Sequence, residues 1–112
     1  MGADSFFAFY GIKLAVDPED EDLVSAIETR ADPRFKIARR FGLETHFGRR
    51  TDGEDYFFYI GRKIVWLGSE HDFYIALGTN ELAEIASTVQ ARLKEAGLSE
   101  IPAFHFQMEA QY

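Results

Sequence analysis

The feature that most constrains the fold is the stretch from Tyr56 to Leu67, which is rich in aromatic and β-branched residues and contains no proline. This composition is typical of a β-strand or of two strands joined by a turn. Both alternating sets of side chains are apolar, whereas a strand with one face in water alternates apolar with polar residues. The stretch is therefore predicted to be central and covered on both faces. Gly61-Arg62-Lys63 in its middle leaves open whether it is one bent strand or a hairpin.

Length and composition limit the classes of protein to consider. A chain of 112 residues is expected to form one domain, residues 1–112, that can bury a core. It contains no cysteine, which excludes a disulfide scaffold, a cysteine-ligated zinc site and thiol chemistry. The lack of cysteine fits a reducing cytoplasm, where we expect the protein. No apolar run reaches the length of a membrane span, so we expect no membrane association.

The remaining segments suggest how the central stretch is covered. Asp17-Pro18 and Asp32-Pro33 each predict a helix start, because aspartate caps the first turn and proline suits it. Thr79 or Asn80 is expected to cap the last helix. The predicted elements, in chain order, are a strand at 5–16, a helix after Asp17, a short helix at 33–41, strands at 43–48, 56–67 and 72–77, a helix from Gly78-Thr79-Asn80 to Gly97, and a strand at 102–108. This order predicts an α+β fold: a mainly antiparallel four- to five-stranded sheet with two main helices plus one short basic helix, as in a ferredoxin-like or split β-α-β sandwich.

Two details of these strands bear on the faces of the sheet. The first strand resembles the central stretch at an offset of 50, with Gly11 matching Gly61, and a glycine inside a strand marks a bend, bulge or close approach. In the short strand, Leu43, Thr45 and Phe47 are expected to face inward, and Glu44 and His46 outward. In the last strand, alternation predicts the inward residues Phe104, Phe106 and Met108 and the outward residues His105 and Gln107.

The charge is unevenly distributed. The net charge is −7, which argues against nonspecific binding to DNA or anionic membranes. Residues 30–50 instead carry seven basic and two acidic side chains, a local charge of +5. This basic island is expected either to be a solvated face or to contact an acidic partner; as a contact it would use Arg34, Lys36, Arg39, Arg40, Arg49 and Arg50.

The aromatic content exceeds what two helices can shelter. The chain has eleven Phe, five Tyr and one Trp, many of them in strands with two apolar faces. Soluble monomers seldom expose so large an apolar area, and a second copy of the chain would cover it with one patch used twice. We therefore predict a homodimer, with a different protein or a flat hydrophobic ligand as the alternative cover, unless the short helix 33–41 covers the second face. The predicted self-association face consists of Phe7, Phe9, Tyr56, Phe58, Trp66 and Tyr74.

No catalytic or cofactor motif accompanies these features. We expect no cofactor and no metal, and read His46, His71 and His105 as surface histidines. The favoured function is a non-catalytic protein–protein interaction module. One alternative is a nucleic-acid-linked protein, either a single-strand binder or an acidic DNA mimic. Another is a small enzymatic or ligand-binding sandwich that uses one of the histidines, which no acid–base pair at defined spacing supports.

Overall fold

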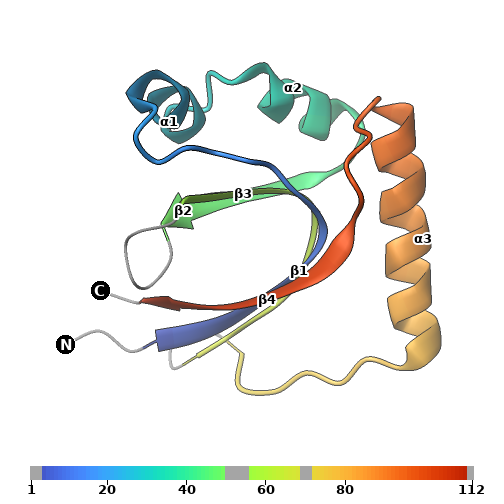
Figure 1. Cartoon of the computed structure of the whole chain (residues 1–112). Coiled ribbons are helices and arrows are strands. Elements are labelled where there is room, and N and C mark those ends of the chain that lie inside the picture. Colours follow the sequence, from blue (N-terminus) through green and yellow to red (C-terminus); the bar gives the residue numbers. More distant parts are fainter. Residues whose placement is uncertain (1–3, 50–55, 69–71, 111–112) are drawn as a thin grey trace.

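The computed structural model describes residues 4–49, 56–68 and 72–110. Within them the four strands form one antiparallel sheet in the order β2-β3-β1-β4, accompanied by three helices (Figure 1). This confirms the α+β prediction with four strands. The elements are β1 (Asp4–Lys13), α1 (Glu21–Glu28), α2 (Pro33–Arg40), β2 (Glu44–Arg49), β3 (Tyr56–Leu67), α3 (Thr79–Glu95) and β4 (Ala103–Ala110).

The central stretch is one continuous strand, β3, which lies between β2 and β1. Its first five residues are buried whichever face they point to, which confirms that it is covered on both sides. The pairing of β1 with β3 steps from Ala8 opposite Val65 to Phe9 opposite Lys63, so Ile64 is an extra residue in a β-bulge. The bulge reverses the alternation of side chains. Trp66 therefore shares a face with Tyr59, contrary to simple alternation along the strand.

The matching glycines of the two central strands are direct neighbours. Gly11 pairs with Gly61 in the β1–β3 ladder. A Cβ built on Gly11 would overlap the carbonyl oxygen of Ile60, and one built on Gly61 would overlap the carbonyl oxygen of Tyr10. Only glycine permits this close approach of two backbones. The strands bend strongly along their length, and all three helices lie outside the bend (Figure 1).

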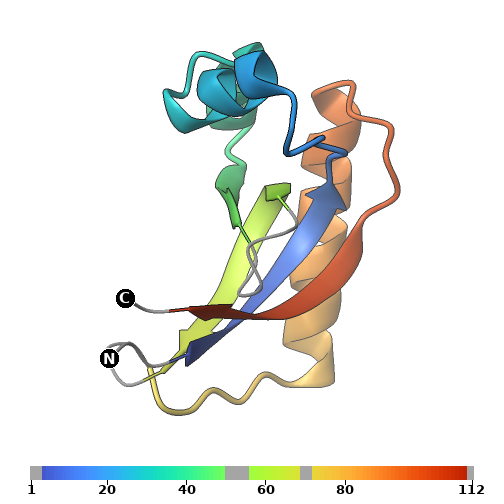
Figure 2. The same ribbon diagram turned by 60° about the vertical axis from the view of Figure 1, so that its left-hand side comes forward.

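The face outside the bend, called here the outer face, carries the larger core. Helices α1 and α2 pack over one end of the sheet and α3 runs alongside it (Figures 1 and 2). No helix in the described ranges is long and apolar enough to cross a membrane. The buried residues of this core are Tyr10, Ile12, Leu14, Val24, Ile27, Phe35, Ala38, Leu43, Tyr56, Phe58, Ile60, Val89 and Leu93.

One helix cap is the residue predicted from the sequence, and two caps differ from the prediction. Asp32 caps α2 as predicted, by accepting a hydrogen bond from the backbone N–H of Arg34 at 2.9 Å. Helix α1 is capped by Asp20 instead of Asp17, because Asp17 closes a turn in front of the helix by accepting from the N–H of Asp20 at 3.0 Å. Helix α3 is capped by Gly78, not by Thr79 or Asn80.

One predicted strand is absent, and the side chains of the last strand are oriented differently from the prediction. Residues 72–77 form an extended segment without a strand, joined to the sheet by a single bridge between Asp72 and Leu67. In β4, Phe106 pairs with Ala8 and Phe104 with Tyr10, so both phenylalanines point to the outer face. That face is not fully covered at β4, and the phenylalanines are exposed instead of inward-facing.

Candidate functional site

Most of the predicted self-association face is interior. Phe7 and Phe9 are fully buried on the inner face, inside the bend of the sheet. Tyr56 and Phe58 are buried on the outer face beneath the helices. Trp66 is partly buried with the inner group, and only Tyr74 is exposed. The prediction of an exposed face made of these six residues is therefore wrong, because the helices cover Tyr56 and Phe58 and the bend closes the inner face on itself.

Ring contacts between strands that are not neighbours show how this closure works. The ring of Phe7 on β1 stacks on His46 of β2 at 4.2 Å, although β3 lies between the two strands. Tyr59 of β3 stacks on His105 of β4 at 4.7 Å across β1. Strands two apart in a flat sheet are separated by roughly 10 Å, so only strong curvature brings such rings into contact. Phe57 of β3 joins this group by lying 5.2 Å from His46 on the neighbouring strand β2. We call this group, Phe7, Phe9, His46, Phe57, Tyr59, Trp66 and His105, the inner cluster.

Three polar side chains of the inner cluster, those of Tyr59, Trp66 and His105, make hydrogen bonds. The Tyr59 hydroxyl lies 2.8 Å from the side-chain oxygen of Gln107, to which it donates. The indole N–H of Trp66 donates to the Ser5 hydroxyl at 2.6 Å. Nε2 of His105 lies 2.9 Å from the carbonyl oxygen of Gly11, to which its N–H donates when that nitrogen is protonated. His46, His105 and Gln107 were predicted to face outward, and this is wrong. At these positions β2 and β4 direct their side chains toward the inner cluster.

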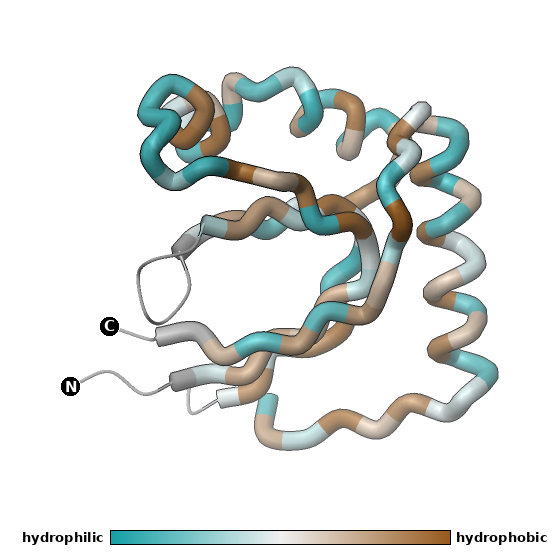
Figure 3. The backbone as a smooth tube through the Cα atoms, in the orientation of Figure 1, coloured by the Kyte–Doolittle hydropathy of each residue, from teal (hydrophilic) through white to brown (hydrophobic). Residues whose placement is uncertain are grey.

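Exposed apolar residues gather at the end of the outer face that is far from α1 and α2. Phe106 is 64% exposed, and Phe73 and Tyr74, in the segment before α3, are 84% and 79% exposed. Figure 3 shows hydrophobic residues along that segment. Sequence reasoning missed most of these residues, because the orientation of β4 depends on its pairing with β1. We call Phe73, Tyr74, Ile75, Phe104, Phe106 and Met108 the outer apolar surface.

A hollow of about 370 Å³ lies within the outer apolar surface. Ile75 and Leu77 form one side of it, and Phe104 and Phe106 of β4 form another. Leu82 at the start of α3 also lines it, and the sheet supplies Phe6, Ala8, Ile64, Val65 and Leu67. Every one of these side chains is apolar, so the hollow offers shape and apolar contact but no group for acid–base or nucleophilic chemistry.

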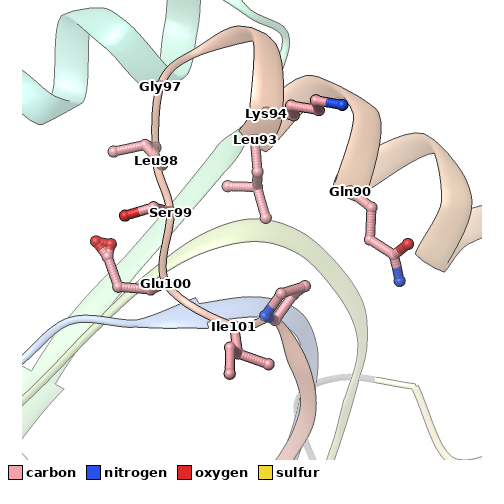
Figure 4. Close-up of a pocket in the computed structure, with 9 residues that line it drawn as sticks. Gln90, Leu93, Lys94, Gly97, Leu98, Ser99, Glu100 and Ile101 are labelled. Carbon is pink, nitrogen blue, oxygen red and sulfur yellow. The ribbon is translucent and has the colours of Figure 1, made fainter.

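A second hollow of about 530 Å³ lies between the end of α3 and the start of β4. Leu93 points across it toward Ile101, while the amine of Lys94 and the oxygens of Ser99 and Glu100 point in different directions (Figure 4). These polar groups do not converge on one place where a substrate could sit. This hollow is therefore a weaker candidate than the outer apolar surface.

Only some side chains of the basic island are free to contact a partner. The guanidinium of Arg34 donates two hydrogen bonds to the carboxylate of Asp32, at 2.9 and 2.8 Å, and lies over the ring of Phe58. These side-chain hydrogen bonds lower the pKa of the Asp32 carboxyl, although burial acts in the opposite direction. Lys36, Arg39 and Arg40 are exposed on α2. The side chain of Arg49, all of Arg50 and His71 lie outside the described residues.

The structure separates groups that the nucleic-acid alternative needs together. A single-strand binder stacks bases on exposed rings beside basic side chains. The exposed rings of β4 lie at one edge of the sheet, whereas α2 contacts β2 at the opposite edge. No cluster of three or more metal-ligating side chains occurs among the described residues. Comparison of the chain with protein-family models, with curated proteins and with solved structures found no match.

Proposed function

We propose that this chain is a non-catalytic protein-interaction module that associates with itself through the outer apolar surface. The observation that carries the proposal is the exposure of three rings: Phe106 beside the apolar hollow, and Phe73 and Tyr74 in the segment that leads to Ile75 on its rim. At roughly 200 Å² for a fully exposed aromatic side chain, these three rings expose on the order of 450 Å². A stable interface buries about 800 Å² on each partner, so the rings supply more than half of it.

The arrangement of elements supports the finer assignment of the fold. We propose that the sheet and helices form a ferredoxin-like sandwich, in which α1 and α2 together occupy the first crossover and α3 the second. The all-antiparallel order β2-β3-β1-β4 supports this assignment. In such a sandwich both edge strands of the sheet are accessible to partners, which suits an interaction module.

Sedimentation velocity at a series of protein concentrations tests self-association. The wild-type chain is expected to sediment as a dimer at high concentration and to dissociate on dilution. Replacing Phe73 and Phe106 together with Ser is expected to raise the dissociation constant by at least 100-fold, because aromatic anchors dominate interface energies. Unchanged circular dichroism would show that the variant folds.

A matched control separates this surface from apolar exposure in general. Ile101 is exposed but lines the second hollow near the end of α3, so Ile101→Ser is expected to leave the dissociation constant within about threefold of wild type. A wild-type chain that stays monomeric at the highest attainable concentration would overturn the proposal. So would equal weakening by Ile101→Ser and by the double variant.

The exposed basic side chains of α2 supply the second part of the proposal. Lys36, Arg39 and Arg40 lie away from the outer apolar surface, so an acidic protein can contact them while the apolar surface is occupied. Contacts of this kind steer association and weaken steeply with salt. We therefore infer that α2 presents a contact for an acidic partner.

A fluorescent polyglutamate peptide tests the basic contact. Binding at low salt is expected to fall at least tenfold in Arg39→Glu/Arg40→Glu. The same two substitutions are expected to leave the dimer dissociation constant unchanged. Absence of peptide binding to the wild-type chain at low salt would overturn this part, and leave self-association to be judged by sedimentation alone.

A further inference from the structure

The two edges of the sheet differ in how they are protected. Natural edge strands are kept from pairing with other chains by charged residues, proline, bulges or short length. Strand β2 has six residues and carries Glu44 and Arg49 at its two ends. Strand β4 has eight residues, pairs with β1 without a register shift, and carries one charged residue, Glu109, with no charged residue or proline from Ala103 to Met108. Within the described sheet β4 has a single strand neighbour, β1.

The sequence of β4 is self-complementary in one antiparallel register. Placing Phe106 opposite Phe106 of a second copy brings Phe104 opposite Met108, so apolar residues meet on the outer face. The same register places His105 opposite Gln107 on the inner face. Moving the register by two residues in one direction puts Pro102 into the ladder, and proline removes a backbone donor. Moving it by one residue pairs the outer face of one copy with the inner face of the other.

Charge favours this register in a chain that otherwise repels itself. Each copy carries a net charge of −7, so two acidic bodies approach best where neither presents a charge. The paired segment Phe104–Met108 is uncharged, and Glu109 of one copy falls opposite Ala103 of the other. No pair of like charges is therefore placed face to face in the ladder.

We propose, on the basis of the proposed self-association, that two copies join through their β4 strands in this register. The product is one continuous eight-stranded antiparallel sheet with a twofold axis at Phe106. The outer apolar surfaces of the two copies then lie side by side across the new ladder. Main-chain hydrogen bonds add to the apolar contact, as in other cases of strand addition.

Cysteine cross-linking tests the register, because the natural chain has no cysteine. The twofold axis places position 106 opposite itself, with Cα atoms about 4.5–5.5 Å apart in an antiparallel ladder. That spacing lies within the range of about 4.4–6.8 Å that a disulfide spans. Phe106→Cys is therefore expected to form a disulfide-linked dimer under mild oxidation, at protein concentrations where sedimentation shows a dimer.

Two further variants provide a control that keeps Phe106 in place. Phe104→Cys alone and Met108→Cys alone are expected not to cross-link, because each position lies roughly 13 Å from its own copy in this register. An equimolar mixture of the two is expected to cross-link, since position 104 lies opposite position 108.

The outcomes separate this inference from the proposed function. A wild-type dimer in which neither Phe106→Cys nor the mixture cross-links would overturn the β4 pairing while self-association stands. A monomeric wild-type chain would overturn both. Cross-linking of Phe104→Cys alone as efficiently as of Phe106→Cys would overturn the register.

Discussion

On the inner face of the sheet, Phe7, Phe9 and Phe57 have almost no contact with solvent, whereas on the outer face at β4 Phe106 is 64% exposed. The residue type is the same and the strands are adjacent, so hydrophobicity does not explain the difference. The inner rings pack on one another, and the bend adds contacts between strands two positions apart, Phe7 with His46 and Tyr59 with His105. At β4 the outer face is the convex side of that bend, where neighbouring side chains diverge. It lies outside the area that the helices cover. Curvature, more than composition, decides which aromatic group is core and which is surface.

The largest expected contrast is between two phenylalanine truncations. Phe9→Ala removes a fully buried ring of the inner cluster and is expected to lower the free energy of unfolding by about 3–5 kcal/mol. Phe106→Ala is expected to lower it by less than about 1 kcal/mol, as for most surface substitutions. Urea denaturation at low protein concentration, where the monomer dominates, measures both. Equal costs for the two variants would contradict the division into core and surface.

The close approach of the two central strands can be tested at the glycine pair. In an ordinary strand, alanine is more stable than glycine by roughly 0.5–1 kcal/mol. Gly61→Ala is instead expected to destabilise the protein by about 1–3 kcal/mol, because the added methyl group meets the backbone at Tyr10. Gly78→Ala serves as the control, since a Cβ there has room and the cost is expected to stay below about 1 kcal/mol. A stabilised Gly61→Ala protein would show that the close approach is not needed.

Substitution of the Asp32–Arg34 pair tests how the core of the outer face is covered beside the helices. Arg34 lies over the buried ring of Phe58, and the carboxylate of Asp32 holds it there. Asp32→Asn keeps a capping oxygen but loses the charge, and is expected to cost about 1–2 kcal/mol at pH 7. The outer apolar surface has no equivalent cover.

The same pair predicts a pH dependence. The pKa of Asp32 is lower in the folded state than in the unfolded state, so its contribution is present above the ordinary carboxyl pKa of about 4 and is lost as the pH falls through the folded value. The difference in unfolding free energy between wild type and Asp32→Asn should therefore shrink in acid. A difference that stays constant from pH 7 to pH 2 would contradict the ion pair.

Two tyrosines give the smallest contrast. The hydroxyl of Tyr59 donates to Gln107 inside the inner cluster, so Tyr59→Phe is expected to cost about 1 kcal/mol. Tyr74 belongs to the outer apolar surface, and Tyr74→Phe is expected to change stability by less than about 0.5 kcal/mol. Thermal unfolding of the two variants beside wild type measures the difference. Similar melting temperatures for both would indicate that the Tyr59 hydrogen bond contributes nothing.

Local sequence patterns were sufficient for much of the fold. The two apolar faces of 56–67 identified the central strand, and Asp32-Pro33 identified the start of α2, because both signals arise from neighbouring residues. The position of Gly11 and Gly61 at matching places in two strands also marked the close approach of the two backbones. These features do not depend on how distant segments pair.

The surface could not be predicted from the same patterns. The bulge at Ile64 reverses the alternation of β3, and the nearby Gly61 does not show by itself which residue is the extra one. The orientation of β4 follows from pairing Phe106 with Ala8, a contact between the two ends of the chain. His105 reads as an outward polar residue until the bend places Tyr59 beneath it. The candidate site was therefore sought in the right residue type but mostly in the wrong strands.

Hydrogen–deuterium exchange at several protein concentrations tests the central claim most directly, because it compares the two edges of the sheet in the unmodified chain. Peptides covering β4 from Ala103 to Met108 are expected to exchange more slowly as the concentration rises, since pairing protects the outer edge. Peptides covering β2 from Glu44 to Arg49 are expected to exchange at the same rate throughout. Concentration-independent exchange along β4, or equal protection of both edges, would contradict the account.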